Sequence, residues 1–223
     1  MFIDPLGLAN IVIVAGGDRA SNNNAFKDNA NTWIKENITS EDTVILIDVG
    51  NNTYSTVTSN SRVENDKTYS SANNVMDAVK DAFGSDGIDK LIFECHSGSS
   101  SLVLRYDISL SESKFRDYFK DRWVFHDKQV KLNDDAIIKF TGCETGKGDN
   151  SFAQKAANVT GKTVWGATTT TSQVMLQGGG KTYQMTETAI TTGISNGTIY
   201  QKDGAFYTYS KPTNTGHIKY TKK

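Results

Sequence analysis

The sequence contains few cysteines, prolines and histidines: its 223 residues include only two cysteines, two prolines and three histidines. Two cysteines are too few for a disulfide scaffold, and they do not supply the four ligands of a typical structural zinc site. The sequence alone leaves open a disulfide between Cys95 and Cys143. Any chemistry that needs an imidazole has only His96, His126 and His217 to draw on.

An excess of charge is also missing, because 24 Lys and Arg face 25 Asp and Glu, for a formal net charge of -1. This balance argues against a nucleic-acid-binding protein that neutralises phosphates, and against a polybasic membrane anchor. No apolar run approaches the roughly 20 residues that span a bilayer, and the N-terminus lacks the basic and apolar regions of a signal peptide. We therefore expect no nucleic-acid partner, no membrane anchor and no signal peptide.

Short apolar runs alternate with amphipathic segments through residues 10–170. Apolar runs of five to seven residues bounded by turn residues predict strands, and apolar residues at helical spacing predict helices. The expected strands are 11–15, 43–49, 90–95, 135–141 and 162–167, and the expected helices are 23–36, 71–83, 110–123 and 150–159. This alternation predicts an α/β fold with a mainly parallel sheet flanked by helices.

The remaining segments have weaker patterns. Residues 51–70 are polar without a clear period, so we expect a loop there, and 101–106 alternates weakly, as in a hairpin arm. Ser109 followed by Glu112 has the spacing of a capping box and predicts the start of the third helix. The last expectations are a weak helix over 183–194, a hairpin over 199–209 and an edge strand or loose tail over 217–223.

Two of the predicted strands end in small-residue loops that carry reactive side chains. Strand 90–95 leads into His96, and strand 135–141 leads into Gly142 and Cys143. Ligands bind at the carboxyl ends of parallel strands, so two adjacent strands would hold an imidazole beside a thiol at one sheet edge. Such a pair predicts a cysteine nucleophile, Cys143, and a general base, His96, which later protonates the leaving amine.

Each of these residues also has a plainer interpretation. Cys143 would be a small buried hydrophobe and His96 a hydrogen-bonded core histidine. The tight polar loop around Cys143 favours function, because backbone N–H groups there would lower the thiol pKa and stabilise an oxyanion. Cys95 is expected in the core, on the opposite face of its strand from His96. His126 and His217 lack comparable surroundings and are expected to be ordinary surface histidines.

Other motifs fall short of a known pattern. Gly180-Lys181-Thr182 would need a glycine at the position of Met175 to match a phosphate-binding loop. Gly16-Gly17-Asp18 is too short for a dinucleotide-binding turn, and Ser97 is not embedded in a nucleophile elbow. We therefore expect neither a cofactor nor a metal ion.

The N-terminus resembles a known processing motif. Asp4-Pro5-Leu6-Gly7-Leu8 is similar to the D-P-x-G-L motif at the end of the core shell of Rhs-repeat proteins. In that family the shell cuts itself after this leucine and releases a variable C-terminal toxin. The resemblance implies that residues 1–8 are a remnant of the autocleavage motif and residues 9–223 a toxin. It also implies export by a contact-dependent machine such as type VI secretion, delivery into the target-cell cytoplasm, and a cognate immunity protein.

A second resemblance covers residues 10–170. The order of strands, with His96 after the third and Cys143 after the fourth, resembles the caspase-like cysteine peptidases, including the CHAT and clostripain-type members. The resemblance implies a caspase-like core over about 10–170 with a C-terminal β-hairpin appendage over about 171–223. It assigns His96 as the base and Cys143 as the nucleophile.

Further site residues follow from the same resemblance. Backbone amides of Ser97, Gly98 and Cys143 would form the oxyanion hole, and Asp18 and Glu144 would contact the substrate. Ser97 stands where the family usually has glycine. Thr141 stands two positions before the cysteine, where Arg-specific relatives often carry an aspartate, so that position gives no support for a basic residue before the scissile bond.

Together these patterns predict an antibacterial toxin that acts as a cysteine endopeptidase on a protein of the target cell. Two alternatives stay open. One is a nucleotide- or NAD-consuming enzyme that uses the same sheet edge. The other is a binding module that acts by occupying a partner.

Overall fold

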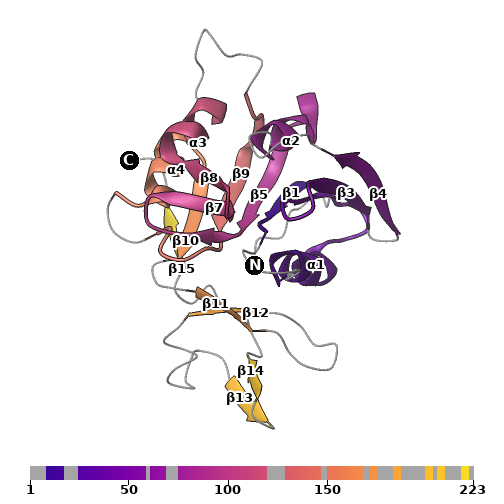
Figure 1. Cartoon of the computed structure of the whole chain (residues 1–223). Helices are drawn as coiled ribbons and strands as arrows, with labels where there is room; N and C mark the ends of the chain where they lie inside the picture. Colours follow the sequence, from indigo (N-terminus) through magenta and orange to yellow (C-terminus); the bar gives the residue numbers. More distant parts are fainter. Residues whose placement is uncertain are drawn as a thin grey trace.

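The structure, a computed structural model, describes residues 9–17, 25–58, 61–68, 75–119, 129–146 and 150–167, and five short strands after these. Helices separate groups of strands along the first part of the chain (Figure 1). The helices are α1 (Ala25–Asn37), α2 (Val75–Asp81), α3 (Glu112–Phe119) and α4 (Phe152–Thr160), with a 3₁₀ turn, η2 (Gly84–Asp86).

The main sheet has eight strands in the described part of the chain. They are β1 (Asn10–Ala15), β2 (Thr43–Asp48), β3 (Thr53–Thr58), β4 (Ser61–Thr68), β5 (Ile88–Glu94), β9 (Leu132–Phe140), β10 (Thr163–Ala167) and β15 (His217–Tyr220). Their order across the sheet is β15-β10-β9-β5-β1-β2-β3-β4. The strands from β10 to β2 run parallel. β15 pairs antiparallel with β10 at one edge, and at the other side β3 pairs antiparallel with β2 and β4 antiparallel with β3. The predicted α/β fold with a mainly parallel sheet is therefore confirmed.

Smaller sheets surround this core. A three-stranded sheet contains β6 (His96–Ser97), β7 (Ser101–Arg105) and β8 (Ile108–Ser111). Two hairpins follow, one of β11 (Thr171–Val174) with β12 (Tyr183–Thr186) and one of β13 (Ile199–Lys202) with β14 (Ala205–Thr208). The predicted hairpin over 199–209, the arm over 101–106 and the C-terminal edge strand are confirmed.

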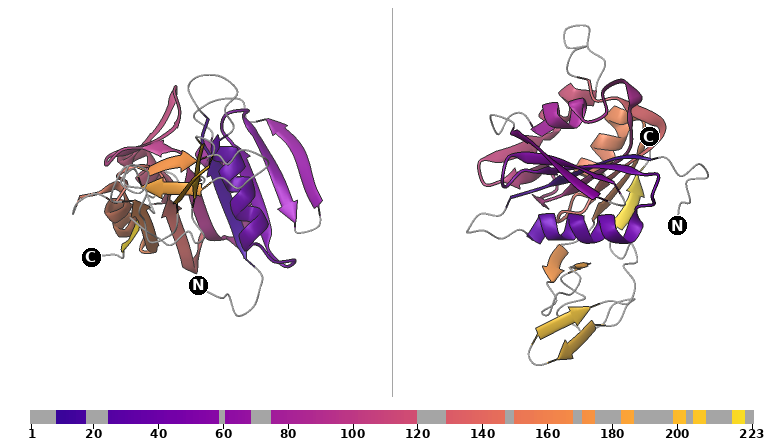
Figure 2. Two further views of the ribbon diagram at one scale, coloured as in Figure 1. Left: turned by 90° about the horizontal axis from the view of Figure 1, so that it is seen from below. Right: turned by 90° about the vertical axis from the view of Figure 1, so that its right-hand side faces the viewer.

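Side chains that alternate along the strands build two apolar clusters, one on each face of the sheet. One cluster packs against α2, α3 and α4, and the other packs against α1. Figure 2 shows α1 on one side of the sheet and the other described helices on the opposite side. The larger cluster includes the rings of Phe93, Phe115, Phe140 and Phe152, which meet edge-on or tilted, with Phe140 and Phe152 centroids 5.1 Å apart. Aromatic rings bury large apolar areas, so this cluster contributes to the stability of the domain.

Three local expectations are wrong. The region 51–70 contains β3 and β4 instead of a loop. β3, which has strand-favouring Thr, Tyr and Val residues, pairs antiparallel with β2, and β4 pairs antiparallel with β3. The third helix begins at Glu112, because Ser109 and Leu110 pair with β7 as part of β8. The Lys114 N–H donates to Ser111 Oγ over 3.4 Å at the start of this helix.

The third wrong expectation is the helix over 183–194. Tyr183–Thr186 is a strand that pairs antiparallel with β11, and the rest of that segment lies outside the described residues. Threonines disfavour a helix and favour a strand, so the pairing prevails over the weak helical pattern. The fourth helix, by contrast, has the expected ends: Ser151 Oγ accepts from the Gln154 N–H, and Gly161 adopts a left-handed conformation.

Candidate active site

The candidate site lies where two neighbouring strands end. β5 and β9 pair in parallel, with Phe93 opposite Phe140, so their carboxyl ends lie at one edge of the sheet. The chain continues from β5 into His96 and Ser97, and from β9 into Gly142 and Cys143. The sequence prediction that these two strands are adjacent is therefore confirmed.

The segments that follow the two strands are in direct contact. The Ser97 hydroxyl donates a hydrogen bond to the Cys143 carbonyl oxygen over 2.8 Å. A Cβ atom at Gly142 would lie 2.6 Å from the Cys95 carbonyl oxygen and would overlap the Ser97 side chain. Only glycine allows this close approach, and the loop that carries Cys143 is thereby seated against the segment that carries His96.

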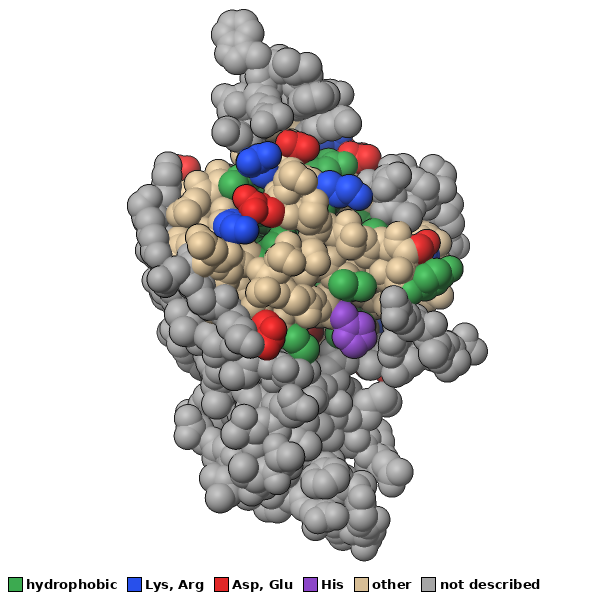
Figure 3. Space-filling model, turned by 60° about the vertical axis from the view of Figure 1, so that its left-hand side comes forward, with side chains coloured by type: hydrophobic (Ala, Val, Ile, Leu, Met, Phe, Trp, Pro, Cys, Tyr) green, Lys and Arg blue, Asp and Glu red, His purple; other side chains and the backbone are tan. Residues whose placement is uncertain are grey.

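His96 and Cys95 lie on opposite sides of their strand, as predicted. The His96 side chain is exposed, and its ring meets Phe26 of α1 edge-on, with centroids 4.8 Å apart. A histidine side chain lies open at the surface in Figure 3. Cys95 is 1% exposed and belongs to the cluster on the other face.

The two cysteines are both free, which excludes the disulfide that the sequence leaves open. Cys143 is partly exposed, whereas Cys95 is buried. Burial raises the pKa of the Cys95 thiol far above its usual range. Cys95 is therefore a protonated core residue, and Cys143 is the accessible thiol of the pair.

The predicted oxyanion residues occupy distinct backbone settings. The Gly98 N–H donates to the Ser101 carbonyl oxygen over 3.0 Å within the turn between β6 and β7. Antiparallel pairs alternate between hydrogen-bonded and non-hydrogen-bonded, so the Ser97 N–H, one residue earlier, points away from β7. Of these two amides, the Ser97 N–H is the one directed out of the hairpin. The roles of Ser97, Gly98 and Cys143 in an oxyanion hole stay predictions.

The two predicted substrate contacts differ in what the structure describes. Glu144 directly follows Cys143, is partly buried and has a φ of 55°. A left-handed φ is uncommon for glutamate, and it turns the chain sharply just after the thiol. Asp18 lies outside the described residues, as does His126. Both substrate-contact roles stay predictions.

The N-terminus of α4 holds both loops. The Phe152 N–H donates to the Ser99 carbonyl oxygen over 3.1 Å, and the Ala153 N–H donates to the Thr145 carbonyl oxygen over 2.8 Å. The buried Thr145 hydroxyl also donates to the Gly142 carbonyl oxygen over 3.2 Å. The first turn of one helix thus fixes the loop after β5 and the loop after β9 relative to each other.

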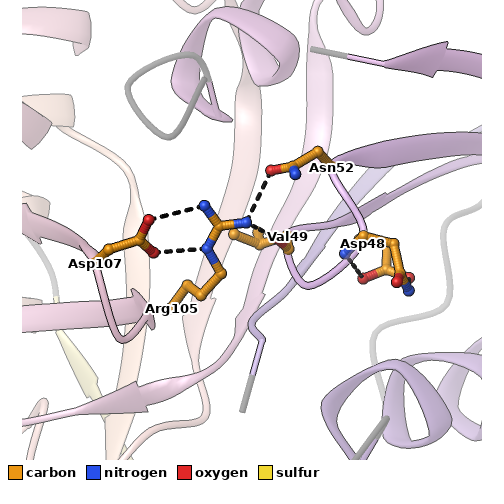
Figure 4. Close-up of polar contacts among 6 residues, drawn as sticks. Asp48, Val49, Asn52, Arg105 and Asp107 are labelled. Atoms are coloured by element: carbon orange, nitrogen blue, oxygen red, sulfur yellow. Dashed lines mark hydrogen bonds and ion pairs between the residues drawn. The ribbon is translucent and has the colours of Figure 1, made fainter. Parts of the chain in front are cut away.

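A second anchor, which the sequence did not reveal, involves Arg105 of β7 (Figure 4). Its guanidinium forms two bonds to Asp107, of 2.6 and 2.9 Å, one to Asn52 of 3.0 Å and one to the Val49 carbonyl oxygen of 3.3 Å. The Gly17 N–H adds a bond of 2.7 Å to the Leu104 carbonyl oxygen. These contacts tie the hairpin that follows His96 to the ends of β1 and β2.

A buried polar cluster beneath the site was also missed. Glu94 is 6% exposed and Thr141 is 1% exposed, and each lies two residues before a predicted catalytic residue. Thr141 Oγ1 lies 2.8 Å from Glu94 Oε2 and 2.9 Å from the Phe93 carbonyl oxygen. The polar residue that ends each apolar strand is the sequence signal that points to this cluster.

A cavity of about 290 Å³ lies away from this edge, between α2, α3 and the β7–β8 hairpin. Its lining includes Met76, Leu104, Lys114 and Tyr118, and none of the predicted site residues. Within the described residues, no three His, Cys, Asp or Glu side chains are grouped to hold a metal ion. No helix in the described part of the chain is long and apolar enough to cross a membrane.

Comparison with protein-family models found no match, and neither did comparison with curated proteins. Among solved structures, the fold is similar to that of a secreted C11 cysteine protease from Bacteroides thetaiotaomicron, determined with an irreversible peptide inhibitor. The TM-score is 0.46 and the identity 11%, and the similarity covers 74% of this chain and 49% of the other. This chain thus spans about half the length of that protease. A similarity of this size leaves the activity to be argued from the residues of this chain.

Proposed function

We propose that this chain is a cysteine endopeptidase in which Cys143 is the nucleophile and His96 is the general base. The observation that carries the proposal is the contact between the two loops, with the Ser97 hydroxyl bonded to the Cys143 carbonyl oxygen over 2.8 Å. It places an exposed imidazole and a partly exposed free thiol on adjoining segments of one sheet edge. This combination supplies the nucleophile and base that covalent catalysis needs.

In the proposed reaction, His96 takes the thiol proton of Cys143, and the thiolate attacks the carbonyl carbon of a peptide bond. Backbone N–H groups at the loop, with that of Ser97 favoured by its direction, would stabilise the oxyanion. Cleavage of the C–N bond leaves a thioester on Cys143, and His96 gives its proton to the departing amine. Water then attacks the thioester with His96 as base, which releases the acid and restores the thiol.

The biological role that we propose is that of an antibacterial toxin, secreted and delivered into the cytoplasm of a target cell, with a cognate immunity protein to protect the producer. This role rests on the resemblance of residues 1–8 to the Rhs autocleavage motif, and those residues lie outside the described part of the chain. A reducing cytoplasm suits the mechanism, because it keeps a catalytic thiol free.

The test is to produce the chain inside a susceptible bacterium and to follow growth. We expect Cys143→Ala and His96→Ala to abolish toxicity while far-ultraviolet circular dichroism and urea unfolding stay close to those of the parent. Cys95→Ala is the matched control, because it removes the buried thiol and should leave the cell-killing activity intact.

Mass spectrometry of new protein termini in the same cells gives the substrate and the cut site. Termini that appear with the parent and with Cys95→Ala, but not with Cys143→Ala, would support proteolysis. Full toxicity of Cys143→Ala would reject the thiol mechanism. Toxicity that persists in both active-site variants would favour a binding module. Activity of the chain that survives alkylation of Cys143 would favour a nucleotide- or NAD-consuming enzyme.

A further inference from the structure

The Thr141 hydroxyl has more oxygen neighbours than it has hydrogens. Its Oγ1 lies 2.9 Å from the Phe93 carbonyl oxygen and 2.8 Å from Glu94 Oε2, both within hydrogen-bond distance. A hydroxyl has one hydrogen to donate, and a carbonyl oxygen can only accept. Both contacts can therefore be hydrogen bonds at the same time only when Thr141 donates to the Phe93 carbonyl oxygen and Glu94 donates to Thr141 Oγ1. A carboxyl group donates only when it is protonated.

Burial favours the same assignment. Glu94 is 6% exposed and lies on the face of the sheet covered by α1, close to apolar neighbours such as Ile92. An ionised carboxylate needs several hydrogen bonds to offset its loss of hydration, and a single threonine hydroxyl is a weak replacement for water. Desolvation raises the pKa of Glu94, and it outweighs the opposing influence of Lys139 and of the hydrogen bond to Thr141.

Among the described residues, the charged and titratable groups nearest to Glu94 lie on its own strand end, on β9 and on β2. Lys139 of β9 lies on the same face, and its own pKa is lowered by burial, so its positive charge is also disfavoured there. His96 and the two cysteines follow on the adjoining segments. Asp48 lies two strands away on β2, in register with Ala15, and is bonded to Lys27 of α1 over 2.9 Å.

We propose that Glu94 is a neutral carboxylic acid in the folded protein and that it positions the catalytic pair by donating a hydrogen bond to Thr141 Oγ1. The resulting chain of hydrogen bonds runs from Glu94 to Thr141 Oγ1 and on to the Phe93 carbonyl oxygen. It links β5 to β9 two residues before His96 and two residues before Cys143. The positioning role rests on the proposed peptidase function, whereas the protonation state does not.

An infrared experiment on the whole chain tests the protonation state without any substrate. We expect the carbonyl band of a protonated carboxylic acid near neutral pH, and we expect Glu94→Gln to remove it. Asp48→Asn is the matched control, because that carboxylate is paired with a lysine, and it should leave the band in place. Absence of the band from the parent protein, or its persistence in Glu94→Gln, would overturn the proposal even if the chain is a peptidase.

The positioning role is tested with a series of substitutions read by peptide cleavage and by the pH profile of iodoacetamide labelling at Cys143. Glutamine carries a neutral donor at the place of the acid, so Glu94→Gln should keep the parental turnover and labelling profile. Glu94→Ala and Thr141→Val break the chain and should lower turnover on the order of tenfold to a hundredfold, the cost of small misplacements at reacting groups. Thr141→Ser restores the hydroxyl and should restore most of the rate.

The outcomes separate the two proposals. If Glu94→Gln is as impaired as Glu94→Ala, the carboxylate charge is what matters and the neutral-acid proposal is wrong. If Thr141→Val has parental turnover, the hydrogen-bond chain does not position the pair. If cells that produce Cys143→Ala still die, and the infrared band is present in the parent and absent from Glu94→Gln, the proposed peptidase function is wrong and the proposed protonation of Glu94 is supported.

Discussion

The two faces of the main sheet are built from the same strands but differ in composition toward the carboxyl edge. The face under α2, α3 and α4 is apolar up to that edge and ends in packed phenylalanines and Cys95. The face under α1 is also largely apolar, but at the carboxyl ends of its strands it carries Asp48, Glu94 and Thr141 as buried polar groups beside Ala15. Alternation along a strand thus lets one face supply stability while the other holds polar groups beside the candidate site.

The largest effect on stability should come from the apolar face. Phe140 is fully buried against Phe93, Phe115 and Phe152, and Phe140→Ala should destabilise the fold by about 3–5 kcal/mol through lost contacts and a cavity. Urea unfolding followed by tryptophan fluorescence measures this loss. Tyr106→Ala is the control, since that side chain is 64% exposed and its removal should change stability by less than about 0.5 kcal/mol. A loss below about 1 kcal/mol for Phe140→Ala would show that the aromatic cluster is not the main source of stability.

The second prediction concerns Gly142 in the loop that carries Cys143, where a substitution should affect activity much more than stability. Gly142→Ala places a methyl group against Ser97 and 2.6 Å from the Cys95 carbonyl oxygen, so the Cys143 loop must move. We expect peptide cleavage to fall on the order of a hundredfold, with a much smaller change in the urea midpoint. Gly98→Ala is the matched control, because a Cβ there meets nothing within 4 Å. Equal activity of the two variants would show that the close contact of the two loops has no part in catalysis.

The sequence predicts the apolar strands of the sheet better than its polar strands and polar contacts. The parallel strands were predictable, because fully buried strands are continuous apolar runs whose limits are marked by glycine and polar residues. The adjacency of β5 and β9, and with it the meeting of the His96 and Cys143 loops, followed from this pattern. Strands β3 and β4 were missed because their polar threonines and serines give no apolar period, and pairing with β2 creates them.

The polar contacts of the site could not be predicted for a different reason. The bonds of Arg105 to Asn52 and Val49 join residues more than 50 positions apart, and no local pattern records such a contact. The pairing of Glu94 with Thr141 depends likewise on the register of β5 against β9. Register and loop approach are tertiary properties, so the sequence indicates which residues are unusual but not which of them meet.

The smallest predicted effect is pH-dependent and concerns the Arg105 anchor at the edge of the site. The bonds from Arg105 lower the pKa of Asp107 below its usual range, chiefly through the side-chain hydrogen bonds and to a lesser extent through the charge of the arginine. A carboxyl group whose pKa is lower in the folded than in the unfolded chain stabilises the fold above its unfolded pKa. This contribution is lost as the pH falls through the lower, folded value.

Arg105→Met should therefore destabilise the protein modestly at neutral pH, by less than Phe140→Ala. The difference from the parent should narrow as the pH falls below about 3.9, the ordinary pKa of aspartate. Thermal unfolding of the parent and of Arg105→Met across this pH range measures the difference in stability. The control compares Asp107→Asn with the double variant Arg105→Met/Asp107→Asn. Because both control proteins lack the titrating carboxyl group, their difference in stability should not narrow as the pH falls. A difference that stays constant with pH would mean that Arg105 acts through Asn52 and Val49 alone, and the anchor would then depend on the β2–β3 turn and not on the ion pair.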